Sequence, residues 1–180
     1  MNITVYLGAN KGNDPALAAA AAELGRWIGG SGHALIYGGS KSGLMGILAE
    51  GVLNSGGRVT GVEPQFFIES EYQYDEITEL IVTPGMAERK AKMTELGDAF
   101  IAFPGGTGTL DEISEIMAAT ALGHMDKPCI LYDLNGYYEG LRTQLARMVS
   151  AGLSSDQRLK NIHFAATLKE IEEILTRHLQ

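Results

Sequence analysis

The sequence predicts an α/β fold in which helices cover both faces of a doubly wound parallel sheet. Short apolar runs alternate with longer helical patterns along all 180 residues. Most of these runs are apolar at nearly every position, which is typical of parallel strands buried on both faces. No linker, internal repeat or low-complexity stretch interrupts the chain. Residues 1–180 are therefore expected to form a single domain.

The elements follow one another regularly. The first strand is expected at residues 3–7, and the first helix at 15–29 has Asp14 as its N-cap and Pro15 at its first position. Residues 63–76 show no regular pattern. Further strands are expected at residues 34–37, 59–62, 80–82, 99–103, 130–132 and around 162–164. Further helices are expected at residues 44–54, 86–96, 110–122, 138–150 and 168–179.

Composition and charge exclude several classes of protein. The chain is 45% hydrophobic and 20% charged, which is typical of a globular protein, and no apolar run is long enough to cross a membrane. The net charge of −8, without a basic cluster, disfavours nucleic acid as a partner. The first seven residues read as a strand without a basic region, so we expect no secretory signal. The one cysteine, Cys129, lies in an apolar run. We therefore expect a cytoplasmic protein with a buried structural thiol.

The clearest candidate site follows the strand predicted at 99–103. Residues 104–112 read Pro-Gly-Gly-Thr-Gly-Thr-Leu-Asp-Glu. Glycines and threonines at a helix start expose backbone N–H groups and hydroxyls to an anion such as a phosphate. The segment lacks the Lys-Ser/Thr pair of a Walker A loop and the spacing of the dinucleotide fingerprint. The alternative is a tight turn with Thr109 as a helix cap.

Two acidic residues close this segment. Asp111 and Glu112 lie near a helix start, where the helix dipole favours carboxylates. A phosphate in the same loop would repel a carboxylate that served only the helix dipole. We therefore expect one of the two to have a role at the ligand and to face it. Glu115, three residues beyond Glu112, lies on the same helix face and could flank the pocket.

Two other glycine turns follow strands. One is Gly8-Ala9-Asn10, and the other contains Gly38 and Gly39, with Ser42 as the expected cap of the next helix. Each alone is a weak signal, because an ordinary β–α turn explains it equally well. Ligands of doubly wound sheets bind beyond the carboxyl ends of the strands, so these turns are expected near one site.

A third segment, residues 86–92, reads Met-Ala-Glu-Arg-Lys-Ala-Lys. A solvated charged helix face is the usual explanation for such a run. These cations open a helix, however, where they are unfavourable unless an anion compensates them. This favours Arg89 facing a phosphate or a developing charge.

These segments resemble the LONELY GUY (LOG) family of cytokinin-activating phosphoribohydrolases, proteins often labelled lysine decarboxylases. The resemblance runs from residue 5 to about 138. Its motifs are Pro-Gly-Gly-x-Gly-Thr-x-x-Glu at 104–112 and Met-x-x-Arg-Lys at 86–90. The segment Tyr-Gly-Gly-x-x-x-Gly-Leu-Met-Gly at 37–46 supports it.

The resemblance implies a Rossmann-like homodimer that needs no cofactor. Its substrate would be a nucleoside 5′-monophosphate, cleaved to the free base and ribose 5-phosphate. Arg89 and Glu112 match the family's catalytic pair, Lys90 the neighbour of the arginine, and Glu71 a substrate-contacting glutamate. The residues matching the phosphate loop are Gly105, Gly106, Thr107, Gly108 and Thr109. Asp111, Gly8 and Gly39 are further candidates for substrate contacts.

Three departures bear on specificity. The family often has His at the position of Ala87, Gly at Ser40, and Thr-Trp-x-Gln at residues 118–121, where this chain has Ala-Ala-Thr-Ala. Residues 118–121 lie on the helix that follows the phosphate loop, near the expected position of the base and of the dimer partner. The choice between AMP and an N6-substituted, cytokinin-type nucleotide therefore stays open.

The residues suit glycosidic hydrolysis. The transition state carries positive charge on the sugar, so a carboxylate near the ribose, assigned to Glu112, would stabilise it and orient a water. Arg89 would anchor the phosphate or assist the departing base. No cluster has the spacing of metal ligands, and no lysine has the surroundings of a pyridoxal phosphate Schiff base. The main alternative is a non-catalytic Rossmann-like nucleotide-binding or carrier protein.

Overall fold

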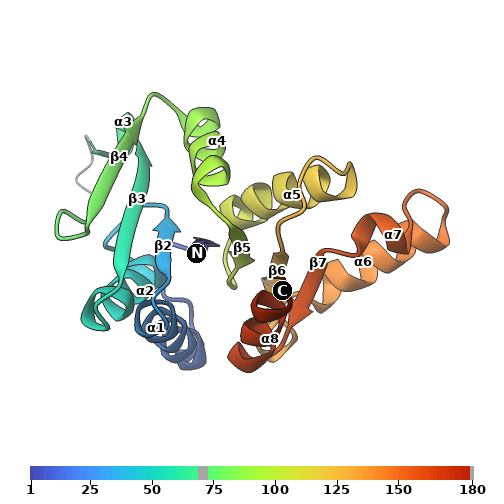
Figure 1. The fold of residues 1–180 in the computed structure, drawn as a ribbon, viewed down its shortest axis with the longest axis horizontal. Helices are drawn as coiled ribbons and strands as arrows, with labels where there is room; N and C mark the ends of the chain where they lie inside the picture. Colours follow the sequence, from blue (N-terminus) through green and yellow to red (C-terminus); the bar gives the residue numbers. More distant parts are fainter. Residues whose placement is uncertain (69–72, 179–180) are drawn as a thin grey trace.

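The computed structural model describes residues 1–68 and 73–178 and confirms the α/β fold class. Seven parallel strands form one sheet in the order β4-β3-β2-β1-β5-β6-β7 (Figure 1). The strands are β1 Asn2–Tyr6, β2 Ala34–Tyr37, β3 Arg58–Pro64, β4 Glu79–Thr83, β5 Ala99–Ala102, β6 Cys129–Tyr132 and β7 Ile162–Ala165.

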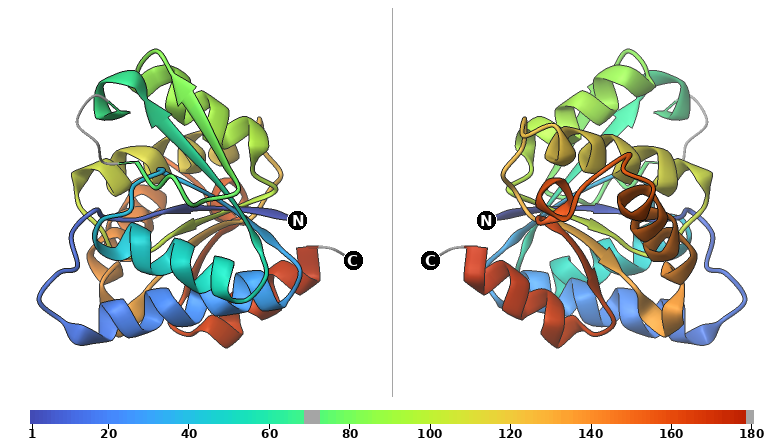
Figure 2. Two further views of the ribbon diagram at one scale, coloured as in Figure 1. Left: turned by 90° about the vertical axis from the view of Figure 1, so that its left-hand side faces the viewer. Right: turned by 90° about the vertical axis from the view of Figure 1, so that its right-hand side faces the viewer.

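Helices cover both faces of this sheet (Figure 2). α1 (Pro15–Gly30), α2 (Gly43–Asn54) and α8 (Leu168–His178) contribute to the core on one face. α4 (Met86–Leu96), α5 (Thr107–Ala121) and α6 (Glu139–Ser150) pack on the other. The short helices are α3 (Gln65–Ile68), α7 (Asp156–Leu159) and the 3₁₀ turn η1 (Leu134–Gly136).

The buried strands explain the continuous apolar runs. Successive side chains of a strand point to opposite faces of the sheet. In β1, Ile3 and Val5 belong to the core beneath α1, whereas Tyr6 belongs to the core beneath α5. Both faces are covered, so neither set of positions needs to be polar. All four residues of β5 are buried for the same reason.

The strand order reverses at β1, which pairs with β2 on one side and with β5 on the other. In a doubly wound sheet this reversal leaves a crevice at the carboxyl ends of the two central strands. The turns that follow β1 and β5 contain Gly8 and Gly105. The topology therefore brings together two of the glycine turns singled out in the sequence.

The predicted helix caps are confirmed in full for α1 and in position for α2. Asp14 caps α1 as predicted, because its Oδ1 accepts a hydrogen bond of 2.9 Å from the Ala16 amide. Ser42 stands at the N-cap of α2, but its side chain makes no cap hydrogen bond. Instead the Ser40 hydroxyl accepts from the Ser42 amide at 3.1 Å. Ser42 therefore holds the N-cap position as predicted, but without the side-chain hydrogen bond of a cap.

α5 begins three residues earlier than predicted, at Thr107. Gly106 is its N-cap, and Thr109 is a buried residue within the first turn. The alternative of a turn capped by Thr109 is therefore wrong. Ile113, Ile116 and Met117 pack into the core of the chain itself, whereas Leu110 in the first turn and Leu122 just beyond the helix are 46% and 67% exposed. The core thus accounts for the buried face of α5.

Two other features bear on the predicted class of protein. Cys129 is fully buried in β6, and burial raises the pKa of its thiol to about 12, so the side chain stays protonated and packs as an apolar group. Across residues 1–68 and 73–178, no helix combines the length and the apolar character that crossing a membrane requires.

Candidate active site

Three glycine turns converge at the carboxyl edge of the sheet. A Cβ atom on Gly105 would lie 3.1 Å from the Gly8 amide nitrogen and would clash with the Thr109 side chain. Gly43, at the start of α2, has φ +59°, and a Cβ there would clash with the Ala9 carbonyl. The turns after β1, β2 and β5 therefore need glycine for close approach, and they form one surface as the sequence predicts.

The loop Gly105, Gly106, Thr107, Gly108 and Thr109 forms the start of α5 on this surface. The first N–H groups of an α-helix have no partner within the helix, and the helix dipole makes this end positive. The loop borders a cavity of about 400 Å³, whose other lining residues are Leu110, Tyr137, Tyr138 and Leu141. The arrangement can hold an anionic group beside an apolar and aromatic wall.

Two tyrosines that sequence reasoning missed hold this loop in place. The Tyr137 hydroxyl donates to the Gly105 carbonyl at 2.5 Å, and the Tyr138 hydroxyl donates to the Phe103 carbonyl at 2.8 Å. Tyr138 is also anchored at its amide, which donates to Asp133 at 2.6 Å. The signal in the sequence was an aromatic pair following a strand at the ligand-binding edge.

Arg89 and Glu112 form a buried ion pair between α4 and α5. Their Nη1 and Oε1 atoms are 2.6 Å apart, and the two residues are only 5% and 7% exposed. Arg89 also donates from Nε to the Val62 carbonyl of β3 at 2.9 Å. A buried charge requires such partners, because desolvation would otherwise disfavour it strongly. Glu112 is thus the anion that compensates a cation near the start of α4.

The electrostatics of Glu112 suit proton transfer. Burial raises the pKa of its carboxyl, while the charge and the hydrogen bond of Arg89 act in the opposite direction. The balance leaves the pKa above its ordinary value, which brings the group closer to the range in which a carboxylate exchanges protons near neutral pH.

Lys90 and Asp111 lie beside the buried pair and neutralise each other. The Lys90 ammonium is 2.9 Å from Asp111 and 3.1 Å from Glu115. These two hydrogen bonds raise the pKa of Lys90, so the amine stays charged. Glu115 thus binds Lys90 beside the buried pair, but it does not line the cavity at the start of α5. Glu71, the predicted substrate contact, lies outside the described residues.

Gly38 and Gly39 contact the ionisable groups of the site. A Cβ on Gly38 would clash with Nη2 of Arg89, and one on Gly39, where φ is +90°, would lie 3.2–3.4 Å from the side chain of Glu63. Both glycines thus leave room for an ionisable side chain, which is a stronger reason for their presence than an ordinary turn.

Glu63 was not predicted as a site residue. It lies near the end of β3 and is 1% exposed. Burial raises the pKa of its carboxyl to about 7, the charge of Arg89 lowers it, and that of Asp75 raises it. In the sequence, Glu63 falls at the start of the stretch 63–76 that shows no regular pattern, whereas the structure extends β3 through Pro64 and so places this acid within a strand.

This pKa predicts how stability depends on pH. Between the unfolded value of 4.5 and the folded value of about 7, the folded chain holds a proton that the unfolded chain has released. The free energy of unfolding is therefore expected to fall as pH rises through this window, by on the order of 3 kcal/mol from Glu63. Urea unfolding at pH 5 and pH 8 would measure this loss. Glu63→Gln should show a smaller loss, and equal losses in both proteins would contradict the assignment.

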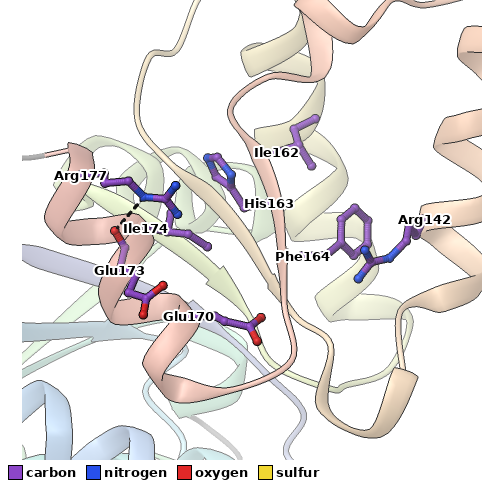
Figure 3. Close-up of a pocket in the computed structure, with 8 residues that line it drawn as sticks. All are labelled: Arg142, Ile162, His163, Phe164, Glu170, Glu173, Ile174 and Arg177. Atoms are coloured by element: carbon purple, nitrogen blue, oxygen red, sulfur yellow. Dashed lines mark hydrogen bonds between the residues drawn. The ribbon is translucent and has the colours of Figure 1, made fainter.

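A second cavity of about 400 Å³ lies elsewhere, between α6, β7 and α8 (Figure 3). Its charged residues are engaged with the chain itself. Arg142 binds Asp133 at 2.9 Å and covers the Phe164 ring, while Arg177 donates to the Glu173 carbonyl of its own helix. None of the predicted site residues lines this cavity, so we place the site at the loop of α5.

No group of three or more His, Cys, Asp or Glu in the described part of the chain is arranged to hold a metal ion.

Comparisons with known proteins show the family to which the chain is similar. The model of a family described as "Possible lysine decarboxylase" matches residues 45–175. A Rhodococcoides fascians protein named cytokinin riboside 5′-monophosphate phosphoribohydrolase is 43% identical over 152 residues, which cover 84% of this chain and 77% of the relative. An Arabidopsis thaliana relative, named cytokinin riboside 5′-monophosphate phosphoribohydrolase LOG1, is 36% identical. The alignment covers 98% of this chain and 84% of the relative.

Solved structures with the same fold include carrier proteins. The molybdenum cofactor carrier protein of Chlamydomonas reinhardtii superposes with a TM-score of 0.75, and the alignment covers 99% of this chain and 97% of the carrier. The molybdenum cofactor binding protein of Rippkaea orientalis gives a TM-score of 0.73 with the same coverage. Sequence identities of 24% and 23% make these a likeness of fold alone.

Proposed function

The chain belongs to the LONELY GUY family, which the matching family model describes as possible lysine decarboxylases, and we propose that it hydrolyses the N-glycosidic bond of nucleoside 5′-monophosphates. The observation that carries this proposal is the buried Arg89–Glu112 pair beside the N-terminus of α5. A carboxylate and an anion site on one helix suit a substrate that has a phosphate at one end and a cleavable sugar carbon nearby.

The proposed reaction adds one water across the bond between C1′ and the base. As this bond lengthens, its electron pair moves to the base and positive charge develops on the sugar. Glu112 stabilises this charge and accepts a proton from the water that attacks C1′. The departing base takes up a proton. Gly105, Gly106, Thr107, Gly108 and Thr109 bind the phosphate, and Arg89 orients the Glu112 carboxylate.

Lysine decarboxylation fits these residues less well. A Schiff-base lysine must lose its proton to attack an aldehyde carbon. Lys90, the lysine beside the buried pair, is held in its charged form by Asp111 and Glu115. Its surroundings favour a structural or electrostatic role next to Arg89.

The deciding experiment follows base and ribose 5-phosphate released from AMP, GMP, CMP and N6-isopentenyl-AMP. Release of base from AMP or its N6-substituted form would support the proposal and rank the bases, which the departure at residues 118–121 leaves open. If these nucleotides raise the melting temperature and release no base, the chain is a nucleotide-binding or carrier protein instead.

Gly38→Ala tests the position of Arg89. The added methyl group would displace the guanidinium from Glu112, and small misplacements of this kind cost about 10²-fold in rate. We expect kcat/KM for AMP to fall by about that factor. The variant also disturbs a buried ion pair, so a melting curve must show that the protein is still folded. Gly140→Ala, where a Cβ meets nothing within 4 Å, is the matched control. Unchanged kcat/KM in the Gly38 variant would exclude this role for the contact.

We also propose that the chain acts in the cytoplasm as a homodimer, as its family resemblance implies. Cys129 is the only cysteine of the sequence, so no disulfide within the chain is needed for this fold. Sedimentation equilibrium would measure the oligomeric state.

A further inference from the structure

Three buried polar atoms lack a partner at the edge of the site. Among residues 1–68 and 73–178, Tyr37 Oη, Glu63 Oε2 and Gln73 Oε1 are the buried side-chain N and O atoms without a hydrogen bond. All three residues adjoin one turn. Tyr37 precedes it, the Glu63 side chain contacts Gly39 within it, and Gln73 pairs with Ser40 as an isolated bridge. Each unpaired buried polar group lowers the stability of the fold by about 1–3 kcal/mol. Three such groups around one turn therefore suggest that the turn serves a function.

Arg89 interacts electrostatically with two buried carboxyls, those of Glu112 and Glu63. It forms the ion pair with Glu112 at 2.6 Å, and within the described residues no ion pair joins it to Glu63. Gly38 and Gly39 are adjacent in the chain, and they contact Arg89 and Glu63 respectively. One guanidinium neutralises one carboxylate. If Glu112 is ionised, an ionised Glu63 therefore leaves this part of the site with a net negative charge.

The groups that face Glu63 come from α4, from β2 and from the segment before β4. Arg89 of α4 attracts its ionised form, and Asp75, in the segment before β4, repels it. Tyr37 of β2 is neutral, because burial and the charge of Glu63 raise the pKa of its hydroxyl. Within the described residues, the charges that act on Glu63 are thus one cation, Arg89, and one acid, Asp75.

We propose, on the basis of the proposed hydrolase function, that Glu63 is a positioning residue whose proton sets the charge of the phosphate site. With its proton, Glu63 leaves Arg89 paired with Glu112, and the site accepts a phosphate dianion. Without it, the second carboxylate competes for the guanidinium and repels the phosphate. The Glu63 pKa of about 7 places this change near neutral pH.

Proton uptake on binding follows from this role. A bound dianion stabilises the protonated form of Glu63, so at pH 7.5 each binding event draws protons from the buffer by linkage. A side chain with a purely structural role would give no such uptake. Ribose 5-phosphate is the suitable probe, because the proposed reaction produces it and does not consume it.

The test measures ribose 5-phosphate binding by calorimetry at pH 6 and pH 8, in two buffers of different ionisation enthalpy. The phosphate's own ionisation near pH 6 affects every variant equally. Relative to Glu63→Gln, the wild type is expected to lose on the order of tenfold more affinity between these pH values. Proton uptake attributable to the protein should vanish in Glu63→Gln. Glu79→Gln, an exposed acid on β4, is the matched control and should behave as wild type.

Asp75→Asn gives a second test at an exposed position, where folding is not at risk. Removing this charge lowers the pKa of Glu63, so the loss of affinity should move to lower pH. Identical pH dependence and proton uptake in the wild type and both variants would overturn the role of Glu63 alone. If the wild type fails to bind ribose 5-phosphate at both pH values, the proposed phosphate site itself is overturned, and base release from AMP then decides whether the chain is a hydrolase.

Discussion

Glu112→Gln is expected to lower kcat/KM for AMP by about 10²–10⁴, the usual contribution of a general base. The amide keeps the shape of the side chain and can still accept a hydrogen bond from Arg89, but it cannot take a proton from water or stabilise positive charge on the sugar. Release of adenine by purified wild type and variant, followed by chromatography, measures the effect.

Stability must be measured with activity, because the variant leaves Arg89 buried without a counter-charge. A melting curve separates loss of fold from loss of chemistry. Glu95→Gln removes an exposed acid that pairs with Lys92 on α4 and is the matched control. A folded Glu112→Gln protein with wild-type kcat/KM would contradict the assignment of Glu112 as the reacting carboxylate.

Adenosine is expected to be a poorer substrate than AMP by on the order of 10³ in kcat/KM. The loop at the start of α5 offers backbone N–H groups to a phosphate. Hydrogen bonds to a charged group contribute about 1.5–3 kcal/mol each, so two of them account for this factor. Adenosine retains the base and the ribose but forgoes these interactions.

Competition experiments separate binding of the phosphate from binding of the sugar. Ribose 5-phosphate should inhibit AMP hydrolysis competitively, and ribose at the same concentration should not. Comparable kcat/KM for AMP and adenosine would mean that the loop of α5 does not bind the phosphate, even if the chain is a hydrolase.

The fold was largely predictable because burial on both faces makes each strand a continuous apolar run. The ends of the helices and strands were less predictable. α5 starts three residues before the predicted position because its N-cap is Gly106, which has no side chain to signal a cap. α3, α7 and η1 were missed, since elements of three or four residues show no periodicity. Glycine-rich turns and motifs, which are local in the sequence, identified the loop, Arg89 and Glu112.

The missing parts of the site depend on contacts between distant segments. Tyr138 reaches a carbonyl 35 residues away, and nothing near it in the sequence indicates this bond. Glu63 follows an apolar strand and precedes proline, a pattern that also fits an exposed loop. Its burial beside Arg89 comes from the packing of α4 over β3, which only the three-dimensional structure reveals.

One helix carries both the turn that we propose binds the phosphate and the carboxylate that we propose reacts, that of Glu112. Glu112 follows Thr107 by five residues, and an α-helix rises 1.5 Å per residue, so the two lie about 7.5 Å apart along α5. This spacing is built into the backbone and does not depend on side-chain rearrangement. It makes the enzyme sensitive to which sugar hydroxyl bears the phosphate: a 3′-phosphate bound in the same turn would hold the glycosidic carbon at a different depth along the helix, out of line with Glu112.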